Sequence, residues 1–249
     1  MSELVAYCRF EVGRLVKSWK FLGITVGFPV IFYMLFLGDR SAGKVIDGTV
    51  PWRVYLMVSM CSFGALVAAL TAGARLSSER ASGWARQLRV TPIPSSSYVV
   101  TKVTASMLVV LPVVVLVELV GSLFGGVHLS PGTWLELSAV MWVAALPLAV
   151  LGVFVGFMVN TETAFPVVTS LMFVLGYFGG LFNPVSSMPG ALRAAARVLP
   201  NFHHTSLGLA VLDGRGPGMT TWLVLVGYTL VCSVAVTAKH RVEESRGLA

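Results

Sequence analysis

Few side chains in this chain could do chemistry, and they are widely spaced. Glu118 is the one carboxylate well inside a long apolar run, where an ionised acid at a bilayer centre costs at least about 2.5 kcal/mol on insertion scales. Such an acid is either a proton or cation site, or a carboxylate that pairs with a neighbouring helix or reaches outer water. We favour the second interpretation, because proton-coupled transport usually needs a relay of polar groups.

His203 and His204 are adjacent histidines and could hold a metal ion or move a proton. Adjacent residues on a helix point in different directions, so we predict ordinary loop or helix-capping roles for both. The cysteines Cys8, Cys61 and Cys232 are far apart and form no CxxC or Cys/His motif. We interpret them as small hydrophobic residues.

Sequence motifs for hydrolytic chemistry are absent. The chain contains no GxSxG, HExxH or GxxxxGK[ST] pattern, which would mark a serine nucleophile, a zinc hydrolase or a nucleotide-binding phosphate loop. We therefore predict that the chain is not an enzyme, that it does not hydrolyse ATP by itself, and that it holds no metal or cofactor of its own.

A polar, basic insert, LSSERASGWARQLRVTPIPSSSYVVTK (residues 76–102), separates two apolar runs. Ser77 or Ser78 could cap a short helix with an acid in its first turn, and Thr91–Pro92 would end it. A short charged helix is suited to receiving a push from a soluble partner, whereas the alternative is an anchor that only fixes orientation. The spacing of the residues in this insert does not decide between a partner-binding helix and an anchor. Three cations would face a partner: Arg80, Arg86 and Arg89.

The elements around these residues are predicted to be membrane helices. Of the 249 residues, 56% are hydrophobic and 12% charged, against roughly 25% charged in soluble domains, and the mean hydropathy is +0.83. A span needs about 20 apolar residues, and backbone polar groups in lipid require a helix. Six segments qualify, over residues 21–37, 55–74, 99–124, 134–159, 164–182 and 220–238. We expect kinks at Pro112 and Pro147.

Charge distribution predicts the orientation. Twelve Lys and Arg residues flank the spans on the side of the termini and the 76–102 insert, and six lie on the other side. The positive-inside rule therefore predicts a multi-pass protein of the cell membrane with both termini in the cytoplasm. The net charge of +7 is not that of a nucleic-acid binder, which would need a continuous basic face with stacking aromatics.

Two segments outside the spans have helical patterns. Residues 1–20 are amphipathic and predict a helix along the inner membrane surface, although a plain extension of the first span is the alternative. Residues 183–218 contain two short patterns, at 189–198 and 202–212. Neither can cross a bilayer, so we expect helices that dip into or rest on the outer leaflet. The two halves of the chain show no repeat of the kind found in secondary transporters.

The 76–102 insert resembles the signature of the type-2 ABC exporter permeases, a family that includes drug-export and polysaccharide-export permeases and the membrane halves of the ABC G subfamily. The resemblance is carried by Glu79-Arg80, Gly83, Leu88, Thr91-Pro92 and Lys102. The six spans, the amphipathic amino-terminal helix and the NPVSSMP and Leu199-Pro200 patterns fit the same family. Trp84-Ala85 departs from the residues that many members have there.

The resemblance implies an all-α integral membrane fold in a single permease domain over residues 1–249. It implies a cytoplasmic coupling loop at 76–97 that sits on a separate ATPase subunit, present in two copies, which would bind ATP and Mg. A second permease protomer, identical or a sister, would complete the path. The implied coupling residues are Glu79, Arg80, Gly83, Arg86, Leu88, Arg89, Thr91 and Pro92. The implied path, between protomers and lined by spans two and five, has the candidates Phe63, Met172, Phe178 and Glu118.

Three function hypotheses follow. The favoured one is the permease subunit of an ATP-driven exporter, and the alternatives are a secondary transporter or channel that uses Glu118 and a non-transporting membrane scaffold. By analogy alone, the cargo would be a small hydrophobic drug-like or antibiotic-like molecule or a lipid, which would make the protein an efflux system for drug or antibiotic resistance. The abundance of Ala, Gly, Val and Arg favours a bacterium of high GC content.

Overall fold

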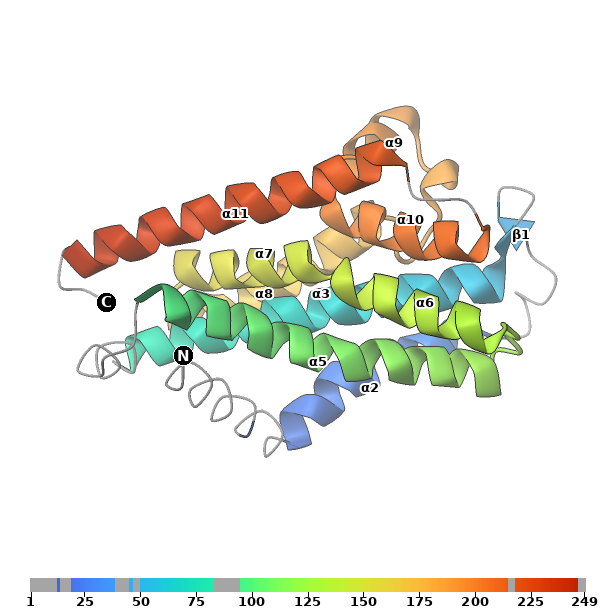
Figure 1. Cartoon of the computed structure of the whole chain (residues 1–249), viewed down its shortest axis with the longest axis horizontal. Coiled ribbons are helices and arrows are strands. Elements are labelled where there is room, and N and C mark those ends of the chain that lie inside the picture. The colour runs from blue at the N-terminus through green and yellow to red at the C-terminus, as the bar shows by residue number, and fades with distance from the viewer. Residues whose placement is uncertain are drawn as a thin grey trace.

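The computed structural model describes residues 13, 19–38, 45–46, 50–82, 95–214 and 218–245, and this part of the chain is mainly helical (Figure 1). The predicted helix over residues 1–20 lies almost wholly outside the described residues. A short antiparallel hairpin pairs β1 (Val45–Ile46) with β2 (Val50–Pro51), and η2 (Val185–Ser187) is a single 3-10 turn. The helices are α2 (Trp19–Phe36), α3 (Trp52–Ala81), α5 (Ser95–Leu123), α6 (Pro131–Val143), α7 (Leu146–Met158), α8 (Thr161–Phe178), α9 (Gly190–Ala196), α10 (Pro200–Leu212) and α11 (Met219–Ser245).

Five helical stretches of the described residues are long and apolar enough to cross a membrane, which confirms a helical, multi-pass architecture. They coincide with the second to sixth predicted spans. The fourth predicted span, residues 134–159, consists of α6 and α7 together. The first predicted span, residues 21–37, corresponds to α2, of which the fully described stretch Thr25–Phe36 is a shorter apolar helix. A sixth span therefore stays a prediction.

Proline interrupts the fourth predicted span, where the sequence predicts a kink. The helix breaks at Ala144–Ala145, and Pro147 falls in the first turn of α7, where its missing N–H costs nothing. The equivalent residue of α5, Pro112, lies within a helix that continues without a break. The two patterns predicted beyond the fifth span are also helices, α9 and α10.

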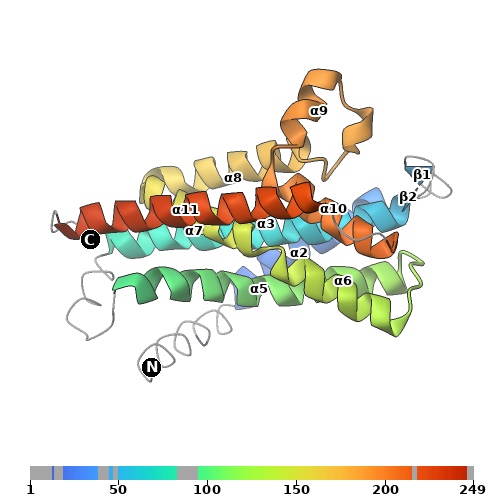
Figure 2. The same cartoon turned by 45° about the horizontal axis from the view of Figure 1, so that its top comes forward.

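Helix α3 is the core of the bundle. Figures 1 and 2 show it running through the middle, with α5 on one side and α8 on the other. Its most apolar stretch is 89% buried, against 17% for α8 and α11. Helices α8 and α11 therefore expose most of their surface to lipid or to a partner. Because α3 is surrounded by other helices, any movement of α3 must displace them.

Small residues bring α3 and α7 into backbone contact. A methyl group added at Gly152 of α7 would lie 2.0 Å from the carbonyl oxygen of Ala69, and one at Gly73 of α3 would lie 2.1 Å from that of Gly152. Gly156, one turn further along α7, approaches the Gly73 carbonyl in the same way. Small residues four apart on both helices are the usual means of close packing in membranes.

The bundle has two distinct ends. The hairpin end contains β1, β2, α9, α10 and the start of α3 (Figure 1). The Glu79 end contains the last turn of α3, the end of α7, the start of α8 and the end of α11. Residues 83–94, which follow α3, lie outside the described residues.

Candidate functional site

The last turn of α3 carries a buried ion pair to α5. The Lys102 ammonium lies 2.5 Å from a carboxylate oxygen of Glu79, and the two side chains are only 7% and 10% exposed. The ammonium also lies 5.5 Å from the ring centre of Tyr98, one turn earlier on α5. Because a buried charge without its partner is costly, this pair fixes the start of α5 against the end of α3.

Arg80, the next residue, contacts α7. Its Nη1 donates hydrogen bonds to the carbonyl oxygens of Gly156 at 3.1 Å and Phe157 at 3.0 Å, and its guanidinium lies 4.9 Å from the Phe157 ring centre. Both carbonyls belong to the last turn of α7, where helix geometry provides no backbone donor. A cation here also interacts favourably with the helix dipole.

A third contact reaches α8, whose Thr161 hydroxyl donates to the Ser77 carbonyl oxygen at 3.3 Å. Residues 77–80, which we call the 77–80 clamp, thus hold the start of α5, the end of α7 and the start of α8 against α3. The local prediction of a helix start was wrong, because Ser77 and Ser78 lie inside α3. Their hydroxyls donate to the Ala74 carbonyl one turn back instead of capping.

The predicted coupling residues are described only in part. Glu79 and Arg80 make the intramolecular contacts above, and their roles toward a partner stay a prediction. The others lie outside the described residues, namely Gly83, Arg86, Leu88, Arg89, Thr91 and Pro92.

The predicted path residues occupy different environments. Phe63 has no exposed surface and packs against the rings of Phe28, Phe32 and Phe182, with centroids 5.1–5.9 Å apart. Met172 is buried on α8. Phe178 is half-buried at the end of α8. In the single chain Phe63 and Met172 serve packing, and a role in a path stays a prediction.

Glu118 is buried between helices. Its side chain is 4% exposed, and it accepts a hydrogen bond from the Ser138 hydroxyl of α6. The contact joins α5 to α6, as the interpretation of a carboxylate paired with a neighbouring helix predicts. Among the described residues, no group of three or more His, Cys, Asp or Glu side chains could hold a metal ion.

A polar network at the hairpin end was missed by the sequence analysis. His204 is fully buried, and its Nδ1 forms a hydrogen bond with the Ser62 hydroxyl of α3. Its Nε2 lies 2.8 Å from the Met141 carbonyl oxygen of α6, and the Thr205 hydroxyl donates to Ser62 Oγ at 2.9 Å. We call Ser62, His204 and Thr205 the 62–204–205 latch, because they hold α10 against α3 and α6.

The latch defines the protonation of its histidine. A carbonyl oxygen only accepts, so Nε2 of His204 carries the proton, and Nδ1 accepts from Ser62. Burial lowers the pKa of His204 to about 4, although its bond to the Met141 carbonyl acts in the opposite direction. The prediction of a loop or capping role was wrong for His204, whereas His203 bonds the carbonyl of Arg197, the C-cap residue of α9, as a capping role predicts. His203 also lies inside α10, with Nε2 2.7 Å from the Arg197 carbonyl oxygen.

One exposed strip of α8 is more polar than the corresponding strip of α11, although α8 also exposes large apolar side chains such as Phe165. Thr163, Ser170 and Tyr177 are exposed on α8 at intervals of seven residues, which places them along one face. At the same interval on α11, Leu223 and Leu230 are exposed and apolar, and the next position is the exposed hydroxyl of Thr237. A lipid-facing surface is expected to be apolar, so the α8 face is the better candidate to meet water, cargo or a partner chain.

Comparison with known proteins gives two matches. Residues 41–238 match the profile of a family described as "ABC-2 family transporter protein". The chain is also similar to a protein of Bacillus subtilis (strain 168) named "Putative transport permease YvfS". The two are 26% identical over 226 residues, which cover 89% of this chain and 90% of the relative.

Proposed function

The chain belongs to the ABC-2 family of transporter proteins, and from this we propose that it is the permease subunit of an ATP-driven exporter. A family of this kind implies an ABC ATPase as the partner of the membrane chain. That ATPase, in two copies, would bind ATP and Mg and supply the hydrolysis for which this chain has no motif.

The 77–80 clamp is the observation that carries the proposal. The clamp lies at the start of the segment that resembles a coupling loop, residues 76–97, and it ties α3 to α5, α7 and α8 through Glu79, Arg80 and Ser77. A push on residues 83–94 would therefore move four helices as a unit. α3 has 30 residues, so it would transmit the displacement over about 45 Å as a single helix.

The positive-inside rule supports a cytoplasmic location for the Glu79 end and for both termini. The hairpin end would then face the outside, with α9 and α10 as the outer re-entrant segment. This orientation puts the clamp where a cytoplasmic ATPase can reach the residues that follow it.

The exposed polar face of α8 supports a path between two permease protomers. Ser170 and Tyr177 lie on this face together with the exposed ring of Phe173. Hydroxyl groups beside an aromatic ring suit a small molecule that is largely hydrophobic, drug-like or lipid-like. The second protomer is a copy of this chain or a sister permease.

Co-purification with the cognate ATPase tests the proposal. The tagged full-length chain is expressed with the ABC ATPase of the same genome, and the ATPase retained in nanodiscs is quantified together with its activity. Charge reversal of the coupling segment, Arg86→Glu with Arg89→Glu, is expected to abolish retention. The matched control is Arg53→Glu at the hairpin end, which removes a cation from the other end of α3 and should retain the ATPase.

Two results would contradict the proposal. Either the wild-type chain never recruits an ATPase, or the charge reversal retains as much ATPase and ATP-dependent export as the wild type does. The first would favour a scaffold or a secondary transporter. The second would remove the coupling role of residues 83–94.

A further inference from the structure

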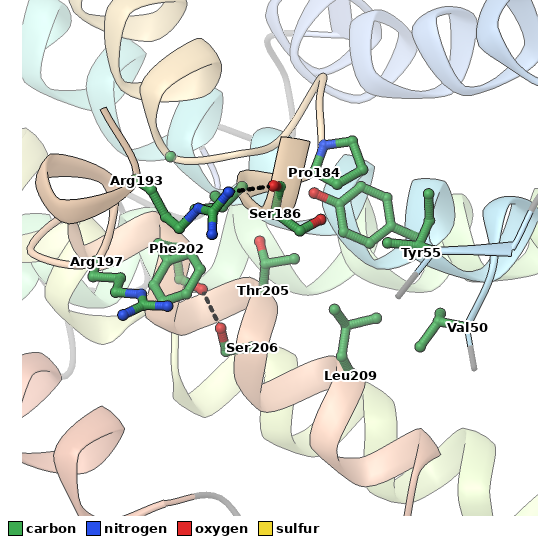
Figure 3. Close-up of a pocket in the computed structure, with 13 residues that line it drawn as sticks. Val50, Tyr55, Pro184, Ser186, Arg193, Arg197, Phe202, Thr205, Ser206 and Leu209 are labelled. Carbon is green, nitrogen blue, oxygen red and sulfur yellow. Dashed lines mark hydrogen bonds between the residues drawn. The ribbon is translucent and has the colours of Figure 1, made fainter. Parts of the chain in front are cut away.

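A cavity at the hairpin end is lined by parts of the chain that are far apart in sequence. Its volume is about 310 Å³, and its walls come from the β hairpin, the first turn of α3 and residues 179–209 (Figure 3). Ligand pockets usually measure roughly 300–1,000 Å³. The cavity can thus hold a head group and a few carbons, but not a large molecule.

One side of the cavity is cationic. Arg193 and Arg197 line it, four residues apart and therefore on one face of the turn that ends α9. None of the described residues that line it is Asp or Glu. Nε of Arg193 is covered by neighbouring atoms and its Nη2 donates to the backbone, so Nη1 is the donor that a ligand could reach.

Arg193 is held in place by the backbone. Its Nη2 donates to the carbonyl oxygens of Ser186 at 2.6 Å and Met188 at 3.1 Å. The guanidinium is thus ordered before any ligand arrives, while the exposed Arg197 beside it can adjust. Arg197 presents the forked donors that suit carboxylate and phosphate oxygens, and Arg193 adds a second, fixed positive charge.

The opposite side is apolar. Figure 3 shows Val50, Leu209 and the Tyr55 ring on the side of the cavity away from the two arginines, and Ile46 also lines it. Trp52 stacks on Tyr55, with ring centroids 5.9 Å apart. Aromatic residues at the end of a span are typical of the membrane–water interface, which is the depth at which the polar group of an amphiphile lies.

We propose that this cavity binds an anionic amphiphile. Its carboxylate or phosphate group contacts Arg193 and Arg197, and the first carbons of its apolar chain pack on Ile46, Val50 and Leu209. The site lies within one protomer, so it is separate from the path proposed between protomers. It does not depend on coupling to an ATPase. The shared chemistry could come from a membrane lipid or from a free amphiphile.

Equilibrium binding to the full-length chain in phosphatidylcholine nanodiscs tests the site. Radiolabelled laurate is the probe, and dodecyltrimethylammonium, with the same chain and the opposite charge, is the competitor. We expect laurate to bind without competition from the cation. Arg197→Gln should weaken binding about tenfold, because it removes a charge-assisted hydrogen bond, and Leu209→Asn should weaken it through the apolar side.

Arg53→Gln is the matched control, since it removes a cation from the same end of the bundle outside the cavity lining. It should change laurate binding less than twofold. Equal weakening by Arg53→Gln and Arg197→Gln, or equal competition by the cationic detergent, would overturn the proposal by showing attraction to the surface alone.

A second experiment identifies whether the amphiphile is a membrane lipid or a free molecule. Phosphatidylglycerol is added to the nanodiscs, and the lipid that stays bound after extraction is measured by mass spectrometry. Retention by the wild type but not by Arg197→Gln supports the site and assigns it to a lipid. Laurate binding without such retention supports it and assigns it to a free amphiphile. If laurate does not bind and no phosphatidylglycerol is retained, the proposal is overturned.

Discussion

The Ser62 hydroxyl donates a hydrogen bond to Nδ1 of His204, although the two residues are 142 positions apart in the chain. Ser62 lies on α3, 18 residues before Arg80, so the two are about 27 Å apart along one helix. The same rod therefore carries the 62–204–205 latch at the hairpin end and the 77–80 clamp at the Glu79 end. A displacement of the clamp along the helix axis would therefore also move Ser62 and change its contacts in the latch.

The latch predicts a loss of stability in acid. His204 is neutral in the folded protein, with its pKa lowered to about 4, whereas an unfolded histidine titrates near 6.5. The unfolded chain binds more protons between these values, so stability is complete above about pH 6.5 and falls as the pH drops toward 4. Between pH 6.5 and 5 the loss at this residue should be about 1–2 kcal/mol.

Thermal unfolding followed by tryptophan fluorescence at several pH values measures this effect. His204→Gln can still donate to the Met141 carbonyl and accept from Ser62, but it does not titrate, so its melting temperature should depend less on pH than that of the wild type. Identical pH profiles for the two proteins would exclude His204 as the titrating group.

The clamp predicts that its two charges depend on each other. Lys102→Met should destabilise the protein by about 3–5 kcal/mol, because the buried Glu79 carboxylate would lose the cation of Lys102. The exchange Glu79→Lys with Lys102→Glu should recover much of that loss. Unfolding can be followed with a thiol-reactive dye in a Cys8→Ser background, since Cys61 and Cys232 are buried.

Glu162→Gln is the control for the clamp, because Glu162 is an exposed acid near the same end of the bundle. Its melting temperature should stay close to that of the wild type. If the charge exchange is as unstable as Lys102→Met, the pairing between Glu79 and Lys102 contributes nothing to the fold.

The contact between α3 and α7 predicts an intolerance to one methyl group. Gly152→Ala would place a carbon 2.0 Å from the Ala69 carbonyl oxygen, so the helices must separate, and the yield of folded protein in detergent should fall sharply. Gly227→Ala is the matched change in α11, where nothing lies within 4 Å, and it should be neutral or slightly stabilising. Equal yields from both variants would show that α7 can move away without cost.

The sequence predicts the elements better than their contacts. The apolar runs and Pro147 determine the last five membrane stretches and the break between α6 and α7, because lipid leaves the backbone few choices. The role of His204 could not be predicted, since its partner Ser62 is a hydroxyl in another apolar run and no local pattern marks the pair. Ser77 was wrongly predicted as a helix cap for a related reason. Lys102 pairs with the buried Glu79, so α3 continues through the serines that the local sequence pattern marks as a new helix start.

Glu118 distinguishes export driven by ATP from transport driven by an ion. Glu118→Gln keeps an oxygen that can accept from Ser138, so transport measured in vesicles with the ATPase bound should stay within about twofold of the wild type. Glu118→Leu would leave the Ser138 hydroxyl without this partner and should cost about 1–3 kcal/mol of stability. Loss of transport in Glu118→Gln with ATPase retention intact would instead support the hypothesis of a secondary transporter.

The polar face of α8 predicts where two protomers meet. In a background without native cysteines, Ser170→Cys on α8 and Leu230→Cys on α11 both place a thiol on an exposed helix face. A disulfide needs Cα atoms within about 7 Å, so only the face at the dimer contact should give cross-linked dimers on oxidation in membranes. We expect Ser170→Cys to cross-link and Leu230→Cys to remain monomeric, because the α11 face is apolar and suited to lipid. Cross-linking through α11 alone would place the path at the other side of the bundle, and the hydroxyls of α8 would then need another explanation.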